Sequence, residues 1–79
     1  MGIYVQIQKQ SSEGNNTNYL FFNENGSGEF SIDNTNGKIN YYRKMPNDLK
    51  NIYFSRAAFK VIKHWQANGM LPDSEVWAS

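Results

Sequence analysis

The sequence contains no cysteine and only one histidine, which removes the usual residues of several classes of site. Without cysteine the chain cannot form disulfide bonds or bind a metal ion through thiolates. The absence of cysteine suits a reducing cytosol, and the first ten residues lack the basic and apolar regions of a signal peptide. We therefore expect a cytoplasmic protein that holds no metal or other cofactor.

Long apolar runs and an excess of one charge are also absent. No stretch approaches the roughly 20 apolar residues of a membrane-spanning helix, so we expect no membrane partner. The net charge is only +1, which gives no bulk electrostatic argument for nucleic acid. The 79 residues are enough for one small domain, residues 1–79, in which aromatic side chains (15% of the chain) supply much of the core.

Four stretches predict strands. Residues 3–8 alternate apolar and polar side chains, the pattern of a half-buried strand, and a polar loop of turn-forming residues is expected over 11–18. The continuous apolar run 19–22 predicts a central strand. It is either covered on both faces, or covered on one face while a partner binds the other. Two further strands are expected over 29–33 and 38–43.

The loop Asn34–Gly37 predicts how the last two strands pair. We prefer a four-residue loop to a two-residue loop at Asn36-Gly37, because it creates sensible cross-strand pairs. These pairs are Asp33 with Lys38, Ile32 with Ile39, and Phe30 with Tyr41.

The preceding turn, expected over residues 25–28, leaves its register open. A two-residue loop would place Phe21 beside Phe30, whereas a three-residue loop would place Phe22 there. A one-residue slip exchanges the two faces of a strand, so either phenylalanine could face the core.

A helix is expected to follow, with Ser55 as its N-cap and Phe54 and Phe59 as a hydrophobic staple around it. Asn68-Gly69 should stop the helix, and Pro72 prevents it from resuming. Apolar residues recur at helical spacing at Ala58, Phe59, Ile62 and Trp65. The prediction is an α+β fold of two layers, a four-stranded antiparallel sheet followed by one C-terminal helix on one face.

The last residues are too apolar for a loose tail on so small a domain. Met70, Leu71 and Pro72 precede Val76 and Trp77. We expect Trp77 to be substantially buried, folded back on the sheet or on the end of the helix.

Catalysis has little support in the sequence. His64 is the first candidate for a general base, but it falls at the edge of the apolar stripe and is expected to lie at the solvent edge. Paired carboxylates could perform hydrolytic or metal chemistry. Glu13, Glu24, Glu29 and Asp33 are read instead as solvated strand ends or as an acidic rim that meets a basic partner. We expect a protein that is not an enzyme.

The stretch Phe54–Trp77 resembles the immunity proteins of bacterial polymorphic-toxin and contact-dependent-inhibition systems, specifically immunity protein family one. The resemblance covers less than a third of the chain. It rests on Ala57, Ala58, Ile62, Trp65, Gly69, Pro72 and Trp77. It implies a small cytoplasmic antidote that binds a toxin domain and occludes its active site or substrate groove.

Protein binding is therefore the leading hypothesis, since a mixture of Tyr and Asn suits a protein-binding face. The residues expected to contact the partner are Glu24, Asp33, Asn34, Asn36 and Tyr42. The matched residues Trp65, Gly69, Pro72 and Trp77 are expected to be structural, as is the N-cap candidate Ser55. The alternative is a small nucleic-acid-binding protein that uses a basic helix face of Arg56, Lys60 and Lys63, with Lys44 and Lys50 nearby.

Overall fold

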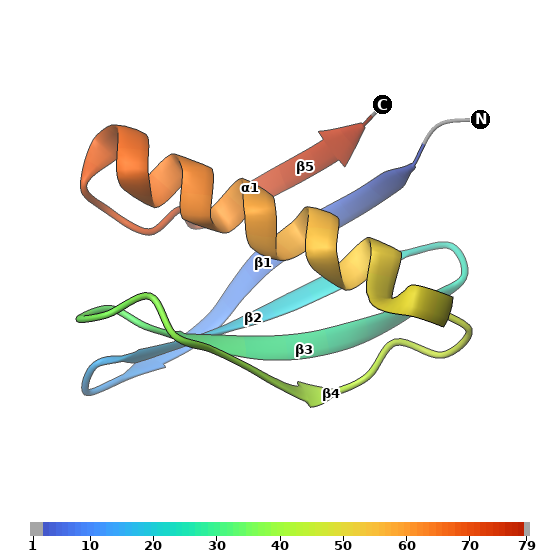
Figure 1. The fold of residues 1–79 in the computed structure, drawn as a ribbon, viewed down its shortest axis with the longest axis horizontal. Helices are drawn as coiled ribbons and strands as arrows, with labels where there is room; N and C mark the ends of the chain where they lie inside the picture. Colours follow the sequence, from blue (N-terminus) through green and yellow to red (C-terminus); the bar gives the residue numbers. More distant parts are fainter. Residues whose placement is uncertain (1–2, 79) are drawn as a thin grey trace.

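In the computed structural model, which describes residues 3–78, a five-stranded antiparallel sheet carries one long helix on one face (Figure 1). The strands are β1 (Tyr4–Glu13), β2 (Asn16–Asn23), β3 (Gly26–Asp33), β4 (Ile39–Arg43) and β5 (Ser74–Ala78), in the order β4-β3-β2-β1-β5. A short 3₁₀ turn η1 (Leu49–Asn51) leads into helix α1 (Ile52–Asn68). The two-layer α+β fold is confirmed, but the predicted number of strands is wrong.

The strand missing from the prediction is β5, formed by the C-terminal segment. It pairs antiparallel with β1, placing Trp77 opposite Val5 and Val76 opposite Gln6. The backbone N–H of Lys9 also donates to the carbonyl oxygen of Asp73 at 2.9 Å, just before the strand begins. Without this segment, one edge of β1 would present unpaired backbone groups. The tail does fold back on the sheet, and it does so as a ladder partner.

The predicted polar loop over 11–18 is also wrong, because β1 and β2 continue through it to a tight turn at Gly14-Asn15. Gly14 has a φ of 57°, which glycine adopts without a Cβ clash. Polar side chains pair with each other across this end of the hairpin, as in the 2.9 Å hydrogen bond from Asn18 Nδ2 to Ser11 Oγ. Turn-forming residues can therefore sit in a ladder when their side chains find partners on the neighbouring strand.

The register of the β3–β4 hairpin is confirmed, with Ile32 opposite Ile39 and Phe30 opposite Tyr41. The backbone N–H of Asp33 donates to the carbonyl oxygen of Lys38 at 2.9 Å, which closes the expected four-residue loop.

Neither register considered for β2 and β3 occurs. The turn lies at Glu24-Asn25, one residue earlier than the two-residue loop considered, so Tyr19 lies opposite Phe30 and Phe21 lies opposite Gly28. The side chain of Asn23 stabilises this earlier turn, because its Oδ1 accepts the N–H of Asn25 at 2.8 Å. Phe21 is the core residue, with none of its surface exposed, and its neighbour Phe22 is only half-buried.

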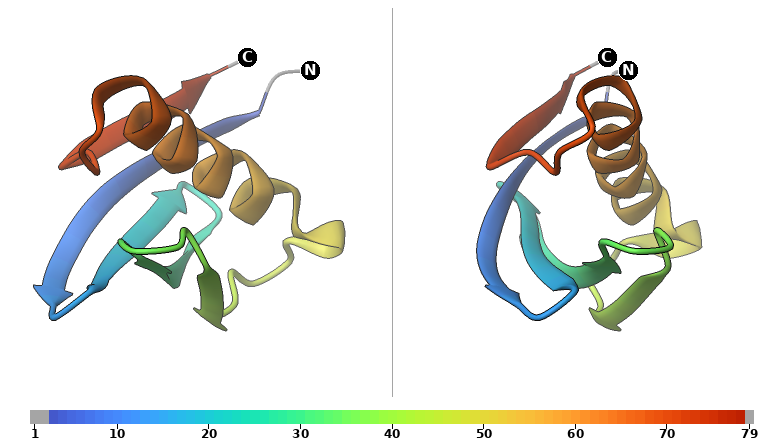
Figure 2. Two further views of the ribbon diagram at one scale, coloured as in Figure 1. Left: turned by 60° about the vertical axis from the view of Figure 1, so that its left-hand side comes forward. Right: turned by 90° about the vertical axis from the view of Figure 1, so that its left-hand side faces the viewer.

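The core fills the space between α1 and the concave face of the sheet, which curves around the helix (Figure 2). Side chains from every second position of β1, β2 and β3 point into it, as the period of a strand requires. The tightest aromatic contact joins Tyr41 of β4 to Phe54 of α1, whose rings stack 3.9 Å apart. The fully buried side chains are Val5, Ile7, Thr17, Tyr19, Phe21, Phe30, Ile32, Ala57 and Val61.

The helix begins three residues before the predicted N-cap, so the assignment of Ser55 as cap is wrong. Both carboxylate oxygens of Asp48 accept backbone N–H groups of the first turn, from Tyr53 at 3.0 Å and from Phe54 at 3.1 Å. The buried face of the helix includes Ala57, Ala58 and Val61, with Ile62 and Trp65 packed against the core, whereas Phe59 is half-exposed and forms no staple. The predicted stop is confirmed, since Gly69 has a φ of 73° and donates its N–H to Trp65 O at 2.8 Å.

This cap assignment is testable by two alanine substitutions. Asp48→Ala should lower the free energy of unfolding by about 1 kcal/mol, because two N–H groups at the helix start lose their acceptor. Ser55→Ala is the matched control and should change it by less than about 0.5 kcal/mol, the range of exposed sites. Urea unfolding measures both. A larger loss from Ser55→Ala than from Asp48→Ala would contradict the assignment.

The loop between α1 and β5 is attached to the core through Tyr19. The Tyr19 hydroxyl donates to the carbonyl oxygen of Pro72 at 2.6 Å, and both residues are buried. Burial raises the pKa of Tyr19 well above its ordinary value of 10.0, and the nearby Asp73 carboxylate adds to the rise. The fold therefore favours the protonated hydroxyl.

Tyr19→Phe should lower the free energy of unfolding by about 1–3 kcal/mol, because the Pro72 carbonyl is left buried without its donor. A pKa raised by folding gives stability that is complete below the unfolded value of 10.0 and is lost as pH rises through the folded value. The parent should therefore lose stability above about pH 10 more steeply than Tyr19→Phe. Parallel slopes in urea unfolding from pH 8 to 11 would refute this role.

Candidate functional site

The convex face of the sheet is the main surface that no element of residues 3–78 covers (Figures 1 and 2). Strand alternation places on it the residues between the buried positions of each strand. We call this surface the outer face. It comprises Tyr4, Gln6, Gln8, Asn18, Leu20, Phe22, Ser27, Glu29, Ser31, Asn40, Tyr42, Arg43 and Val76.

The centre of the outer face is apolar and aromatic. Leu20 and Phe22 on β2 are half-buried among their strand neighbours, although no second layer lies above them. Their direct neighbours on the adjacent strands are Gln6, Gln8, Ser27 and Glu29. Farther out on the same face lie Tyr4, Tyr42 and Val76, with 49%, 47% and 45% of their surface exposed. Amides, hydroxyls and the ion pair of Glu29 with Arg43 fill the remaining positions. This face therefore combines contact area with neutral hydrogen-bonding groups.

The charged side chains of the outer face neutralise each other. Arg43 Nε donates to Glu29 Oε2 at 2.7 Å, and the Tyr42 hydroxyl donates to Glu29 Oε1 at 3.0 Å. The hydrogen bonds from Arg43 and then from Tyr42 lower the pKa of Glu29 below its ordinary value. Arg43 reaches Ser27 as well, at 3.3 Å. The cluster is thus held in place before any partner arrives.

The residues predicted to contact a partner are not gathered at one place. Tyr42 lies on the outer face, whereas Asp33, Asn34 and Asn36 lie at the β3–β4 turn and Glu24 lies at the opposite end of β3. The three turn residues also make intramolecular hydrogen bonds. Asp33 Oδ1 accepts the N–H of Thr35 at 2.8 Å, Asn34 Oδ1 accepts from Thr17 at 3.1 Å, and Asn36 Oδ1 accepts the N–H of Lys38 at 2.8 Å.

The basic helix face is largely engaged with β5. The guanidinium of Arg56 lies 5.3 Å from the centre of the Trp77 ring, and Lys60 Nζ lies 3.7 Å from Glu75 Oε1. His64, the histidine considered for catalysis, contacts the same carboxylate at 3.2 Å through Nδ1. Lys63 Nζ lies 5.9 Å from the Phe59 ring. The contacts of Arg56, Lys60 and His64 hold the helix against β5, whereas that of Lys63 lies within the helix.

The residues that carry the family resemblance have structural positions. Ala57, Ala58 and Pro72 are buried, Gly69 ends the helix, and Trp65 and Trp77 pack against the core cluster. Trp65 packs closely on the β3–β4 loop, because a Cβ built on Gly37 would come within 3.0 Å of its ring.

Other kinds of site find no support within residues 3–78. The side chains described there contain no group of three or more His, Asp or Glu arranged to hold a metal ion. None of the helices in that range is long and apolar enough to cross a membrane. Comparisons of the chain with models of known families, with curated proteins and with solved structures found no match.

The signal for the outer face was present in the run 19–22. Four consecutive apolar residues place two side chains on each face of a strand, and only one face can be covered by the single helix. The expectation that a partner could bind the other face of this strand follows, because the helix leaves that face uncovered. The contributions of Gln6 and Val76 were missed, because they depend on the unpredicted pairing of β5 with β1.

Proposed function

We propose that this chain is a non-enzymatic protein-binding module that docks its partner on the outer face. The observation that carries the proposal is the uncovered pair Leu20 and Phe22, with half-exposed Tyr4, Tyr42 and Val76 farther out on the same face. The centres of protein interfaces are depleted in charge and enriched in aromatic residues. The outer face has this composition, with Glu29 and Arg43 satisfied by each other at its side.

The partner we propose is a toxin domain, which the module would neutralise in the cytoplasm by occluding its active site or substrate groove. This choice is supported by the C-terminal resemblance to immunity protein family one. The residues that carry the resemblance fold the helix and its return to the sheet. The outer face is therefore the surface left free to be shaped for a particular toxin.

Nucleic-acid binding by the helix is the alternative, and two contacts weigh against it. Arg56 lies over the Trp77 ring and Lys60 is near Glu75, so phosphate would have to displace existing partners. A salt-dependent gel shift that is lost in a Lys63→Gln variant would favour this alternative over docking on the sheet.

The test is co-expression with the product of the adjacent upstream gene, followed by affinity measurement. Leu20→Asp places a charge at the centre of the outer face and should weaken binding by about tenfold or more, the effect of losing about 1.4 kcal/mol at a central apolar contact. Leu49→Asp is the matched control, since Leu49 is 79% exposed in η1, away from the sheet.

Both variants are first compared with the parent by circular dichroism, so that a loss of binding is not a loss of fold. The proposal fails if the neighbouring gene encodes no toxin domain and its product does not bind at micromolar concentration. Docking on the outer face fails if Leu49→Asp weakens binding as much as Leu20→Asp.

A further inference from the structure

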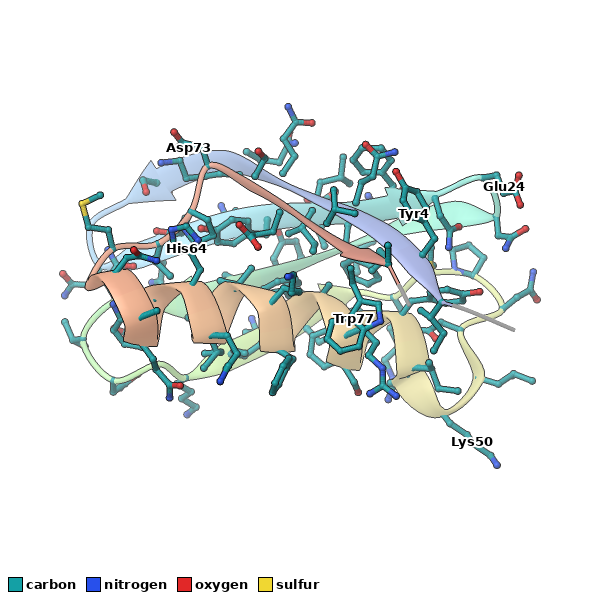
Figure 3. The ribbon with its side chains drawn as sticks, turned by 90° about the horizontal axis from the view of Figure 1, so that it is seen from above. Tyr4, Glu24, Lys50, His64, Asp73 and Trp77 are labelled. Carbon is teal, nitrogen blue, oxygen red and sulfur yellow. The ribbon has the colours of Figure 1, made fainter. Side chains whose placement is uncertain are left out.

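A pocket opens where the outer face meets the β2–β3 turn. Its volume is about 430 Å³. Three aromatic side chains contribute to its walls from different elements: Tyr4 of β1, Phe22 of β2 and Tyr53 of α1. The remaining lining residues are polar and comprise Gln6, Asn23, Glu24 and Asn25. Figure 3 shows Tyr4 and Glu24 together at this end of the sheet.

The rim of the pocket is fixed by Asn23. Its Nδ2 donates to the carbonyl oxygen of Tyr4 at 3.1 Å, and its Oδ1 accepts the N–H of Asn25 at 2.8 Å. One side chain thereby ties the first residue of β1 to the β2–β3 turn. These two hydrogen bonds hold Tyr4 and the turn that carries Glu24 in a fixed relation to each other. Little conformational entropy is therefore lost in ordering them when a group binds.

The charge in this pocket is not neutralised within the described part of the chain. Among residues 3–78, Glu24 makes no ion pair within 4.0 Å, unlike Glu29, Asp73 and Glu75. Glu24 is exposed at the turn and lines the pocket together with the three rings. The faces of aromatic rings also carry negative potential. A carboxylate and several ring faces around one opening favour a cation with a flat apolar surface.

We propose that this pocket receives an arginine side chain of the partner protein, whose guanidinium pairs with Glu24 and stacks on the aromatic wall. The inference rests on the proposed function, because the pocket shares Tyr4, Gln6 and Phe22 with the outer face. Arginine fits better than lysine, since a planar guanidinium can stack on a ring while it donates two hydrogen bonds to one carboxylate. The pocket therefore acts as an anchor at one end of the docking surface.

The experiment needs no knowledge of the partner. The ¹⁵N-labelled full chain is titrated with Nα-acetyl-arginine amide and, separately, with the citrulline analogue, which has nearly the same shape and no charge. The backbone amide signals of Asn23, Glu24 and Asn25 report on the pocket. Low ionic strength is used, because salt screens exposed pairs.

The arginine probe should give saturable shifts at these three amides, and the citrulline probe should bind about threefold to tenfold more weakly, as expected for one ion pair and one stacking contact. Glu24→Gln should reduce the arginine affinity by a similar factor. Glu13→Gln is the matched control, because it makes the same charge change at the exposed far end of β1 and should bind the probe as the parent does.

Three results would overturn the inference: no saturable shift at these amides, equal binding of both probes, or unchanged arginine affinity in Glu24→Gln. None of them bears on Leu20, so the proposed docking on the outer face is judged separately by the Leu20→Asp measurement. Conversely, if the arginine probe binds but Leu20→Asp leaves partner binding intact, the pocket stands and docking on the outer face fails.

Discussion

Gly28→Val should lower the free energy of unfolding by about 3 kcal/mol, the upper part of the range for overpacked cores. A Cβ at this position would lie 2.5 Å from Cζ of Phe21, 2.8 Å from its Cε1 and 3.0 Å from the carbonyl oxygen of Arg43. The Phe21 ring cannot move aside, since the rings of Phe30, Tyr41 and Phe54 surround it at 6.0, 5.8 and 6.2 Å. The Phe21 ring therefore occupies the space that a side chain at position 28 would need.

A double-mutant cycle separates this clash from the lower strand propensity of glycine. Phe21→Leu frees space, so the loss caused by Gly28→Val should be smaller by about 1 kcal/mol or more in the Phe21→Leu background, as for residues in contact. Urea unfolding of the four proteins gives the coupling. A Gly28→Val protein as stable as the parent, or strictly additive effects, would show that Phe21 does not pack on this glycine.

Trp77→Ala should lower the free energy of unfolding by about 2–4 kcal/mol, somewhat less than for a fully buried tryptophan. Most of the surface of Trp77 is buried, as expected, although the residue is not fully enclosed. Its ring lies 5.8 Å from that of Phe59 in an edge-to-face arrangement, with Arg56 on one ring face. Losing it removes the main contact between β5 and the start of α1.

Two further substitutions control for the nature of this contact. The Trp77 Nε1 atom is enclosed and has no hydrogen-bond partner among the described residues, so Trp77→Phe should cost less than about 1 kcal/mol. Val76→Ala, the adjacent residue on the outer face, should change stability by less than about 0.5 kcal/mol. Thermal unfolding measures all three. A Trp77→Ala protein that melts with the parent would mean that the ring does not stabilise the fold.

Features set by neighbouring residues could be predicted from the sequence. The β3–β4 hairpin followed from its loop and its cross-strand pairs, and the helix stop followed from Gly69 and Pro72. Prediction failed where a distant residue decides. Asp48, and not Ser55, caps the helix, because its two carboxylate oxygens accept the N–H groups of Tyr53 and Phe54, five and six residues further along the chain. β5 forms by pairing with β1, at the other end of the chain, along the edge that β2 does not occupy.

The candidate site was only partly predictable for the same reason. Tyr42 was proposed because a mixture of Tyr and Asn suits a protein-binding face, and Glu24 because it belongs to an acidic rim that could meet a basic partner. The centre of the outer face required knowing that one helix covers only one side of the sheet. The pocket beside Glu24 is lined by residues of β1 and β2 and by Tyr53 of α1, which lies far from them in the sequence. No local sequence pattern therefore predicts it.

Methyl cross-saturation in the complex with the product of the upstream gene tests the docking surface most directly. The partner is protonated and irradiated, and the chain carries labelled methyl groups on a deuterated background. The signals of Leu20 and Val76 on the outer face should lose intensity, while those of the exposed residues Leu49 in η1 and Ile52 at the start of α1 should not. Loss confined to Leu49 and Ile52 would place the partner on the helix side and contradict docking on the sheet.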